Sequence, residues 1–440
     1  MITRILNFWN RLRSNMWLIP AVMSAVASAL AFAARQLDSA IAASSFDWLG
    51  WLLYHGNVDG ARTLLSTVAG SMITVTGVTF SVTMVALSLA SSQFGPRLLL
   101  NFMRDRGNQL VLGTFISTFL YCLVALGIGG EQETLASGVS ASLGLILALT
   151  SIGSLIYFIH HVASTIRAEH IVDVVARDVE SAIDRILMEH DEDQSQGYNG
   201  RADVRVDMSG GGIVTAFKSG YIQGIDEPGL LSVSTSVDVL IKLLRRPGHF
   251  VIKGQPLASV LPASQLTSKV TSLIQQYFII GRNRTDDQDP EYGIRQLVEV
   301  AVRALSPGIN DPHTAILCVD WLSSVLHSVA KGRIRSPFCY DQDGTLRLIC
   351  DPITFEGLVG ASFDQIRQCS YSIPPVSIRI MEALASIARS VVDPIQAAVL
   401  TRQADALLAG AIDAGLQKVD QMELEDRYRS LVKNVRSGAG

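Results

Sequence analysis

Four long windows of the sequence contain no Asp, Glu, Lys or Arg, and this feature limits the possible folds more than any other. The windows cover residues 14–34, 63–96, 107–130 and 134–166. Each has at least the ~20 residues that a helix needs to cross a hydrocarbon core of ~30 Å. The sequence therefore predicts a membrane domain at residues 1–166 with four transmembrane helices, at about 15–34, 64–92, 109–129 and 137–160.

The rest of the chain has the pattern of a globular protein. Only 17% of the 440 residues are charged and the mean hydropathy is +0.31, but the charges concentrate after residue 166. The sequence predicts an α-helical membrane domain followed by an α+β cytoplasmic region. That region is divided into a connecting helix and linker, a small β-barrel-like module, a helical module and a flexible tail, at residues 167–200, 201–262, 263–432 and 433–440.

The placement of Lys and Arg near the helix ends predicts the orientation. Arg4, Arg11 and Arg13 precede the first helix, and Arg97 lies between the second and third. Acidic residues outnumber basic ones in residues 35–62, and the loop that holds Glu131 and Glu133 has no base. Both termini are therefore expected in the cytoplasm, with the protein spanning a bacterial inner membrane. A cleaved leader ending near Ala33 is the competing interpretation.

The second window is too long and too polar for a simple anchor. Its ~34 residues would form a helix of ~51 Å, well over the membrane thickness. At 100° per residue, one stripe about 120° wide gathers small and hydroxyl residues, and a narrower stripe with Thr76, Thr79 and Thr83 lies opposite. Either helix packing or a water-filled pore around an oligomer axis accounts for them. The pore-lining candidates are Thr67, Ser71, Thr74, Gly77, Ser81 and Ser88.

His160 and His161 stand where the fourth helix leaves the membrane. Adjacent histidines on a helix point about 100° apart, which is poor geometry for one shared metal. Anchoring at the membrane interface is therefore expected for His160, His161 and Arg97, and ligand binding or pH sensing is the alternative.

Short β-branched runs separated by Gly and Pro predict a small barrel within residues 212–260. The closing run PGHFVIKGQPLASV, residues 247–260, resembles the hairpin repeat of biotinyl/lipoyl-type barrel-sandwich domains. The modified lysine of that family has no counterpart here. The resemblance therefore implies a structural or docking module and no carrier role.

Charged residues gather around two Pro/Gly-containing breaks between residues 281 and 312. A solvated loop held by ion pairs explains such a cluster, and a ligand or inter-subunit site is the alternative, because loops between helices commonly carry function. The candidate residues are Arg282, Arg284, Asp286, Asp289, Arg295, Asn310 and Asp311.

Composition and motifs exclude several classes of function. A net charge of −4 with no basic face gives no argument for nucleic-acid binding. The five cysteines form no CxxC pair, so neither a disulfide framework nor a zinc site is expected. P-loop, dinucleotide-binding, HExxH and GxSxG motifs are missing from the sequence. We therefore expect no enzyme, no cofactor and no resident metal.

Three stretches together resemble the DUF2254 family of bacterial predicted membrane proteins. They are ASSQFGPRL at residues 90–98, IHH at 159–161, and RTDDQD at 284–289 with RALSPGINDP at 303–312. The resemblance implies a bacterial inner-membrane setting and no established activity.

These patterns favour a homo-oligomeric channel or passive transport protein with the pore nearest the second helix. The expected partners are the lipid bilayer, further copies of the chain and a small ion. The alternative is a membrane-anchored sensor or scaffold that binds a ligand or partner through its cytoplasmic loops.

Overall fold

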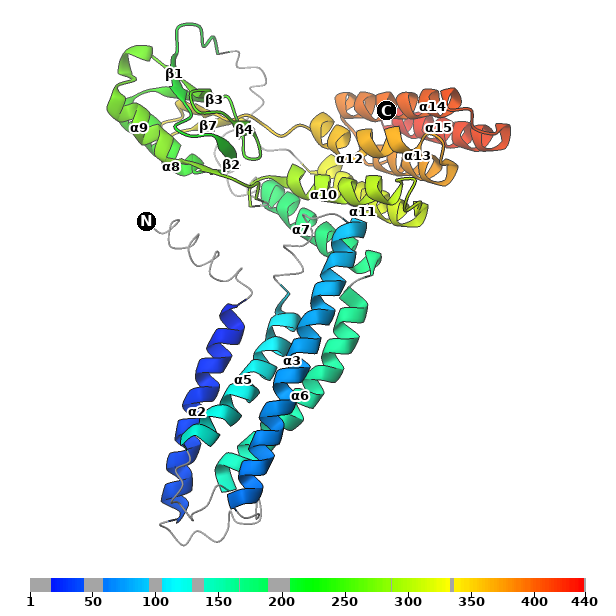
Figure 1. The fold of residues 1–440 in the computed structure, drawn as a ribbon. Helices are drawn as coiled ribbons and strands as arrows, with labels where there is room; N and C mark the ends of the chain where they lie inside the picture. The colour runs from blue at the N-terminus through cyan, green and yellow to red at the C-terminus, as the bar shows by residue number, and fades with distance from the viewer. Residues whose placement is uncertain are drawn as a thin grey trace. The chain divides into compact units, whose positions relative to one another are not determined.

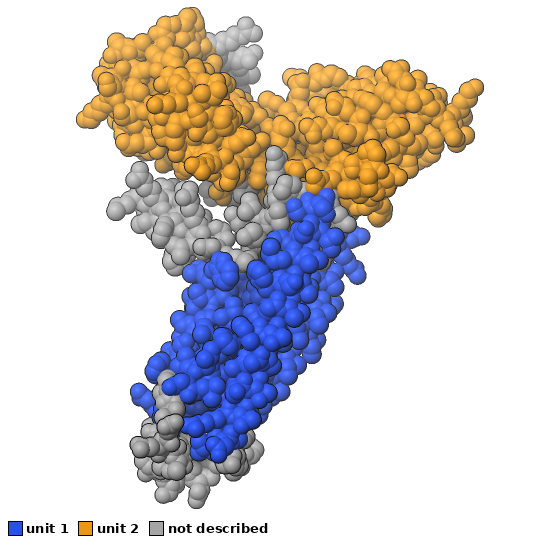
Figure 2. Space-filling view, in the orientation of Figure 1, with its two compact units in different colours: residues 1–170 blue, residues 171–440 orange. Residues whose placement is uncertain are grey.

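A computed structural model describes residues 17–42, 58–94, 105–128, 138–165, 167–188, 206–285, 287–332 and 336–438. The chain divides into two compact units, residues 1–170 and 171–440 (Figure 2). Two predicted site residues, Arg97 and Asp286, lie outside the described residues.

The first unit is a bundle of long apolar helices (Figure 1). Each of the four is long and apolar enough to cross a membrane, as the sequence predicts. The third of them packs against the other three and is the most buried, with Phe115, Tyr121 and Cys122 fully enclosed. The helices are α2 (Leu18–Ala42), α3 (Val58–Phe94), α5 (Arg106–Ile128) and α6 (Gly138–Thr165).

The helices extend past the bounds that charge-free windows predict. Helix α3 has 37 residues and begins at Val58, before Asp59 and Arg62. Helix α2 ends at Ala42, after Arg35 and Asp38. A charge ends an apolar window, but it does not interrupt backbone hydrogen bonding, so a helix continues through it.

The second unit begins within the amphipathic helix α7 (Ala168–Met188), at Ile171. Its buried side chains recur at helical spacing, among them Val172, Val175, Val179 and Ile183. Val179 packs directly against Gly293, where a methyl group would find no room. The part of the predicted linker at residues 189–200 lies outside the described residues.

Two sheets follow. One is five-stranded with the order β1-β5-β3-β8-β7, and the other is three-stranded with the order β4-β2-β6. All pairs are antiparallel except β3 with β8, which align Ile241 with Leu348 in parallel. The strands are β1 (Gly212–Thr215), β2 (Gly220–Ile225), β3 (Leu240–Leu243), β4 (Phe250–Val251), β5 (Pro256–Leu261), β6 (Phe278–Gly281), β7 (Phe338–Tyr340) and β8 (Leu346–Ile349).

The strand-rich part therefore reaches beyond residue 262, where the sequence analysis placed its end. Strand β6 and the β7–β8 hairpin come from the segment expected to be helical. Each is at most four residues long, and the β3–β8 pair joins segments about 100 residues apart. Local periodicity cannot detect such a pairing, because it depends on tertiary contacts.

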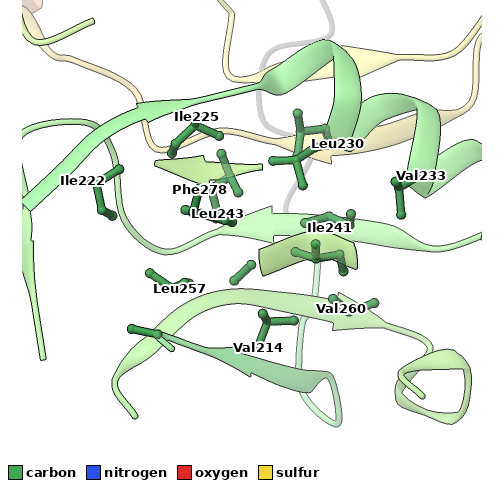
Figure 3. Close-up of a cluster of buried hydrophobic side chains, with 14 of the residues drawn as sticks. Val214, Ile222, Ile225, Leu230, Val233, Ile241, Leu243, Leu257, Val260 and Phe278 are labelled. Atoms are coloured by element: carbon green, nitrogen blue, oxygen red, sulfur yellow. The ribbon is translucent and has the colours of Figure 1, made fainter. Parts of the chain in front are cut away.

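Helices α8 (Glu227–Val237) and α9 (Ser268–Gln276) complete the core of this part. Figure 3 shows Leu230 of α8 with Ile241, Leu257 and Val260 of the large sheet. These four side chains are fully buried. Burial on this scale stabilises by about 1.5–3 kcal/mol per large aliphatic side chain.

Six helices complete the unit: α10 (Pro290–Ala304), α11 (Pro312–Lys331), α12 (Phe355–Ser370), α13 (Pro374–Ala388), α14 (Pro394–Asp413) and α15 (Lys418–Gly438). Helices α11 and α14 start at Asp-Pro pairs. Asp311 caps the Thr314 amide at 3.1 Å and Asp393 caps the Ile395 amide at 2.8 Å. The tail predicted at residues 433–440 is helical through Gly438, because α15 continues its packing against α13 and α14.

Candidate functional site

The polar stripe of α3 lies on the face that the bundle leaves uncovered. All six pore-lining candidates are exposed within the single chain. They share this face with exposed Val78 and Val85, so the stripe is predominantly but not wholly polar. The candidates are Thr67, Ser71, Thr74, Gly77, Ser81 and Ser88.

The opposite face of α3 makes the bundle contacts. Leu65, Ala69 and Met72 are buried where α3 packs against α5 and α6. Thr79, at 2% exposure, and Thr83 are buried on this same face. The narrower stripe of the sequence analysis therefore contributes to packing within one chain, and the wider stripe does not.

The hydroxyl groups of Thr67, Ser71 and Thr74 on the outward face donate hydrogen bonds within their own helix. Thr67 donates to the carbonyl oxygen of Thr63 at 2.7 Å, and Thr74 donates to that of Gly70 at 3.1 Å. This back-bonding lowers the cost of placing a hydroxyl in an apolar setting. Because each hydroxyl donates in these bonds, both lone pairs of its oxygen remain available to accept from water or a neighbouring helix, or to contact a cation.

The glycines of the stripe have no packing role within the chain. Among the described residues, a methyl group added at Gly70 or Gly77 would meet no atom within 4 Å. Gly113 and Gly144 differ, because Met23 and Leu65 respectively fill the space beside them. Small residues let helices approach closely, so Gly113 of α5 and Gly144 of α6 serve packing inside the bundle, whereas Gly70 and Gly77 of α3 face outward, as Gly153 of α6 does.

The small residues of the outward face also follow a regular spacing. Intervals of four and three residues alternate along the run Thr63, Thr67, Gly70, Thr74, Gly77 and Ser81, and Ser88 stands seven residues further on. A period of 3.5 residues keeps one seam facing a neighbour along two supercoiled helices. The outward face therefore has the pattern of a helix-packing seam.

A buried carboxylate joins α2 to α6. Asp38 accepts hydrogen bonds from the backbone amides of Val139 at 2.8 Å and Ser140 at 3.1 Å, and from the Ser140 hydroxyl. The Tyr121 hydroxyl donates to the Ser140 carbonyl oxygen at 3.0 Å. The carboxylate thus satisfies orphan amides at the start of α6 and complements its helix dipole.

The two histidines of α6 have different environments. His160 is exposed within the single chain. His161 pairs with Asp105, which precedes α5, and stacks on Tyr157 with ring centroids 5.2 Å apart. Asp105 also accepts the Gly107 amide at 3.0 Å. His161 therefore links the two helices. Among the described residues, the group of potential metal ligands includes neither histidine.

The charged loops of the second unit contain an interior ion pair. Both Nε and Nη2 of Arg284 lie within 2.7 Å of Oδ2 of Asp289, which is only 4% exposed. Burial raises the pKa of the Asp289 carboxyl, an effect that the Arg284 guanidinium opposes. Arg284 also lies over the Tyr292 ring, 5.8 Å from its centroid. These contacts fix the loop between β6 and α10.

A second ion pair continues the network to the strands. Arg246, after β3, pairs with Glu291 of α10, and Arg295 lies 3.7 Å from the same carboxylate. Burial and the adjacent Arg246 guanidinium lower the pKa of His249. The charges therefore hold the β3–β4 loop against the first turn of α10.

The remaining candidates of this region are dispersed. Arg282 and Arg295 are exposed. Asn310 and Asp311 follow the other end of α10, about 20 Å along its axis. Asn310 has a positive φ of 50°. Burial raises the pKa of Asp311, but hydrogen bonds from the Thr314 hydroxyl and amide outweigh burial and lower it overall. The structure therefore gives Asp311 a capping role and does not bring it to Arg284.

Sequence reasoning missed Asp38, Asp105, Arg246 and Glu291. Asp38 entered the sequence analysis only as one of the acidic residues between positions 35 and 62, and Asp105 did not enter it. Their partners are 102 residues away, for Asp38 and Ser140, and 56 residues away, for Asp105 and His161. No local pattern relates such residues, although an acid beside a membrane span is a signal worth following.

Comparison with known proteins gives a family but no activity. Residues 13–386 match the family described as "Predicted membrane protein (DUF2254)". Uncharacterized proteins of Mycobacterium tuberculosis (Rv1290c) and Mycobacterium bovis (Mb1321c) are each 30% identical over 399 residues. The aligned part is 87% of this chain and 73% of theirs. No solved structure matches the chain.

Proposed function

This chain belongs to the DUF2254 family of predicted membrane proteins, and we propose that it is a homo-oligomeric membrane channel or passive transport protein. In this proposal, the outward face of α3 lines or lies beside the path that the transported species follows between the copies of the chain. The chain is placed in a bacterial inner membrane with both termini in the cytoplasm, in agreement with the Lys and Arg distribution. The cytoplasmic region, including a barrel-sandwich-like module, serves as its gate or regulator.

The observation that carries this proposal is the position of the polar stripe relative to the bundle. Thr67, Thr74 and Ser81 face away from α5 and α6, so packing within one chain does not explain them. Facing lipid, a run of small and hydroxyl residues gains little, because lipid provides neither close packing nor hydrogen bonds. A second copy or water gives those residues a role.

The length of α3 supports the same function. Its 37 residues correspond to about 55 Å, against ~30 Å for the hydrocarbon core. The excess is available to form a vestibule where the helices of several copies meet. The stripe spans most of this length, from Thr67 to Ser88.

The charged loops give less support to a sensor or scaffold. The two residues that would anchor a ligand, Arg284 and Asp289, are already paired with each other in the interior. Separating such a pair to bind a ligand leaves a buried charge without its partner, which costs about 3–5 kcal/mol. The outward face of α3 contains no such pair, and Thr67, Ser71 and Thr74 donate within their own helix.

Electrical recording tests the proposal. Purified oligomers of the full chain in planar bilayers are expected to conduct ions. Thr74→Cys and Ser81→Cys should lose current after treatment with a charged, water-soluble thiol reagent. Ile73→Cys is the matched control, because Ile73 is exposed on α3 but lies about 100° from Thr74 around the helix. Its current should not respond.

Two results would overturn the proposal. One is the absence of current from intact oligomers over a range of voltage, pH and membrane tension. The other is equal reactivity of Ile73→Cys and Thr74→Cys, which would show that the stripe has no special access to water.

A further inference from the structure

Three potential metal ligands converge in the strand-rich part of the second unit. They are the carboxylate of Glu227 and the thiols of Cys339 and Cys350. One ligand atom from each lies within 4.8 Å of the other two. The three residues come from separate segments, so their meeting is a product of the tertiary fold and not of a local motif.

The register of the β7–β8 hairpin explains how the two thiols meet. Cys339 pairs with Leu348 across the antiparallel ladder. Cys350 stands two residues after Leu348, and its amide donates to the carbonyl oxygen of Pro337 at 2.7 Å. Side chains two residues apart on a strand share a face, so both cysteines project on the same side as diagonal neighbours.

Helix α8 supplies the carboxylate. Glu227 is its first residue, and the preceding Asp226 caps the helix by accepting the Gly229 amide at 3.0 Å. The other end of α8 is fixed to the hairpin, because the Ser234 hydroxyl donates to the carbonyl oxygen of Arg347 at 2.8 Å. The position of Glu227 relative to the cysteines is thus held by the fold.

The type and spacing of the ligands select a soft divalent cation. Zn²⁺ binds thiolate sulfur at about 2.3 Å and carboxylate oxygen at about 2.0–2.2 Å in a tetrahedron. Those bond lengths place ligand atoms about 3.5–3.8 Å apart. The three ligand atoms, which lie within 4.8 Å of one another, therefore need to approach each other only slightly to bind one ion. Thiolates are poor ligands for Ca²⁺ and Mg²⁺, which take oxygen.

The burial of the three side chains suits such a site. Each is half-buried, and both cysteines pack against the hydrophobic core of the sheets. The cluster is therefore open enough for an ion to enter and protected enough to retain it. Three protein ligands leave the fourth tetrahedral position for water or another ligand.

We propose that Glu227, Cys339 and Cys350 form a zinc site. The sequence analysis expected no metal because the two cysteines are eleven positions apart and form no CxxC motif. In the folded protein the pairing of β7 with β8 brings the two thiols together, although they are not close in the sequence. Binding releases the thiol protons and links α8 to the hairpin, so the ion stabilises the folded unit by an amount that rises with the logarithm of its free concentration above Kd.

Cobalt titration of the full-length protein tests the proposal. The protein is purified in detergent, reduced with a phosphine, stripped of metal and titrated with Co²⁺ alone. We expect one Co²⁺ per chain, a thiolate-to-cobalt charge-transfer band, and loss of that band when one equivalent of Zn²⁺ is added. Zn²⁺ should also raise the melting temperature of the wild-type protein.

Variants then assign the ligands. Cys339→Ser and Cys350→Ser should each weaken Co²⁺ binding at least about tenfold and reduce the charge-transfer band. Glu227→Gln should weaken binding while the band remains, because both thiolates are retained. Cys369→Ser is the matched control, since Cys369 is exposed on α12, outside the cluster.

Three results would overturn the zinc site. The first is a wild-type protein that shows no charge-transfer band. The second is a band that persists unchanged in both cluster cysteine variants. The third is mass spectrometry of protein taken directly from cells that finds Cys339 and Cys350 joined in a disulfide. Glu227→Gln leaves the core untouched, so its metal affinity remains informative if a cysteine variant fails to fold.

Discussion

The carboxylate of Asp38 in α2 accepts hydrogen bonds from the amides of Val139 and Ser140 at the start of α6, at 2.8 and 3.1 Å. The contact closes one end of the bundle. It also supplies from a different helix the cap that a local Ser or Asp usually provides.

Removing this cap should weaken the first unit. In Asp38→Ala, two amides and the Ser140 hydroxyl lose their acceptor in a buried site, which costs about 1–3 kcal/mol. Asp38→Asn keeps one oxygen and should lose less. Thermal melting of the purified protein in detergent measures both. Asp59→Ala is the control, because Asp59 is exposed at the start of α3. An equal loss in the control would contradict the capping role.

The Arg284–Asp289 pair predicts a difference between two neighbouring arginines. Arg284→Met leaves the Asp289 carboxylate buried without its partner. Breaking a buried pair costs about 3–5 kcal/mol, and we expect about 2–3 kcal/mol because Arg284 is 20% exposed. Arg282→Met, at an exposed position, should change stability by less than about 0.5 kcal/mol. Denaturant unfolding of the two variants decides whether the loop is structural.

Gly248 and Gly254 form a matched pair for the same contact. Their φ angles are +88° and +89°, so an alanine at either position carries comparable backbone strain of about 1–3 kcal/mol. Only at Gly248 would the added methyl group also collide with the Asp289 carboxylate and the Arg284 guanidinium. Gly248→Ala should therefore melt at a lower temperature than Gly254→Ala. Equal melting temperatures would show that the ion pair moves aside freely.

The turn of the β7–β8 hairpin predicts a pH dependence. Hydrogen bonds from the Arg347 guanidinium, at 2.7 Å, and the Thr345 amide hold the pKa of Asp341 below its ordinary value of 3.8. A depressed pKa means that the stabilisation is present above the unfolded-state pKa and is lost as pH falls through the folded-state pKa. The gap in melting temperature between wild type and Asp341→Asn should thus be largest near neutral pH and shrink below pH 3.8. A gap that grows on acidification would contradict this assignment.

The sequence was sufficient for features that depend on neighbours along the chain. Apolar windows located four helices. Helical periodicity also separated the outward stripe of α3 from the buried Thr79 and Thr83. These features follow from helix geometry, which is local.

Contacts between distant segments were not predictable in this way. The parallel β3–β8 pair, the Asp38 cap and the Glu227–Cys339–Cys350 cluster all join residues that local spacing does not relate. The Arg284–Asp289 pair shows the same limit in another form. The sequence located the charges, but whether they face solvent, a ligand or each other depends on how the loop folds against α10.

Cys369 allows the proposed orientation to be tested without a fusion protein. It lies on α12 and is exposed, whereas Cys122 and Cys318 are buried. If the second unit is cytoplasmic, a membrane-impermeant maleimide should label Cys369 in inverted membrane vesicles and leave it unlabelled in intact spheroplasts. Cys369→Ser in the same vesicles identifies the signal from this residue. Labelling in intact spheroplasts alone would place the second unit outside, and the basic residues before the first helix would then not determine the topology.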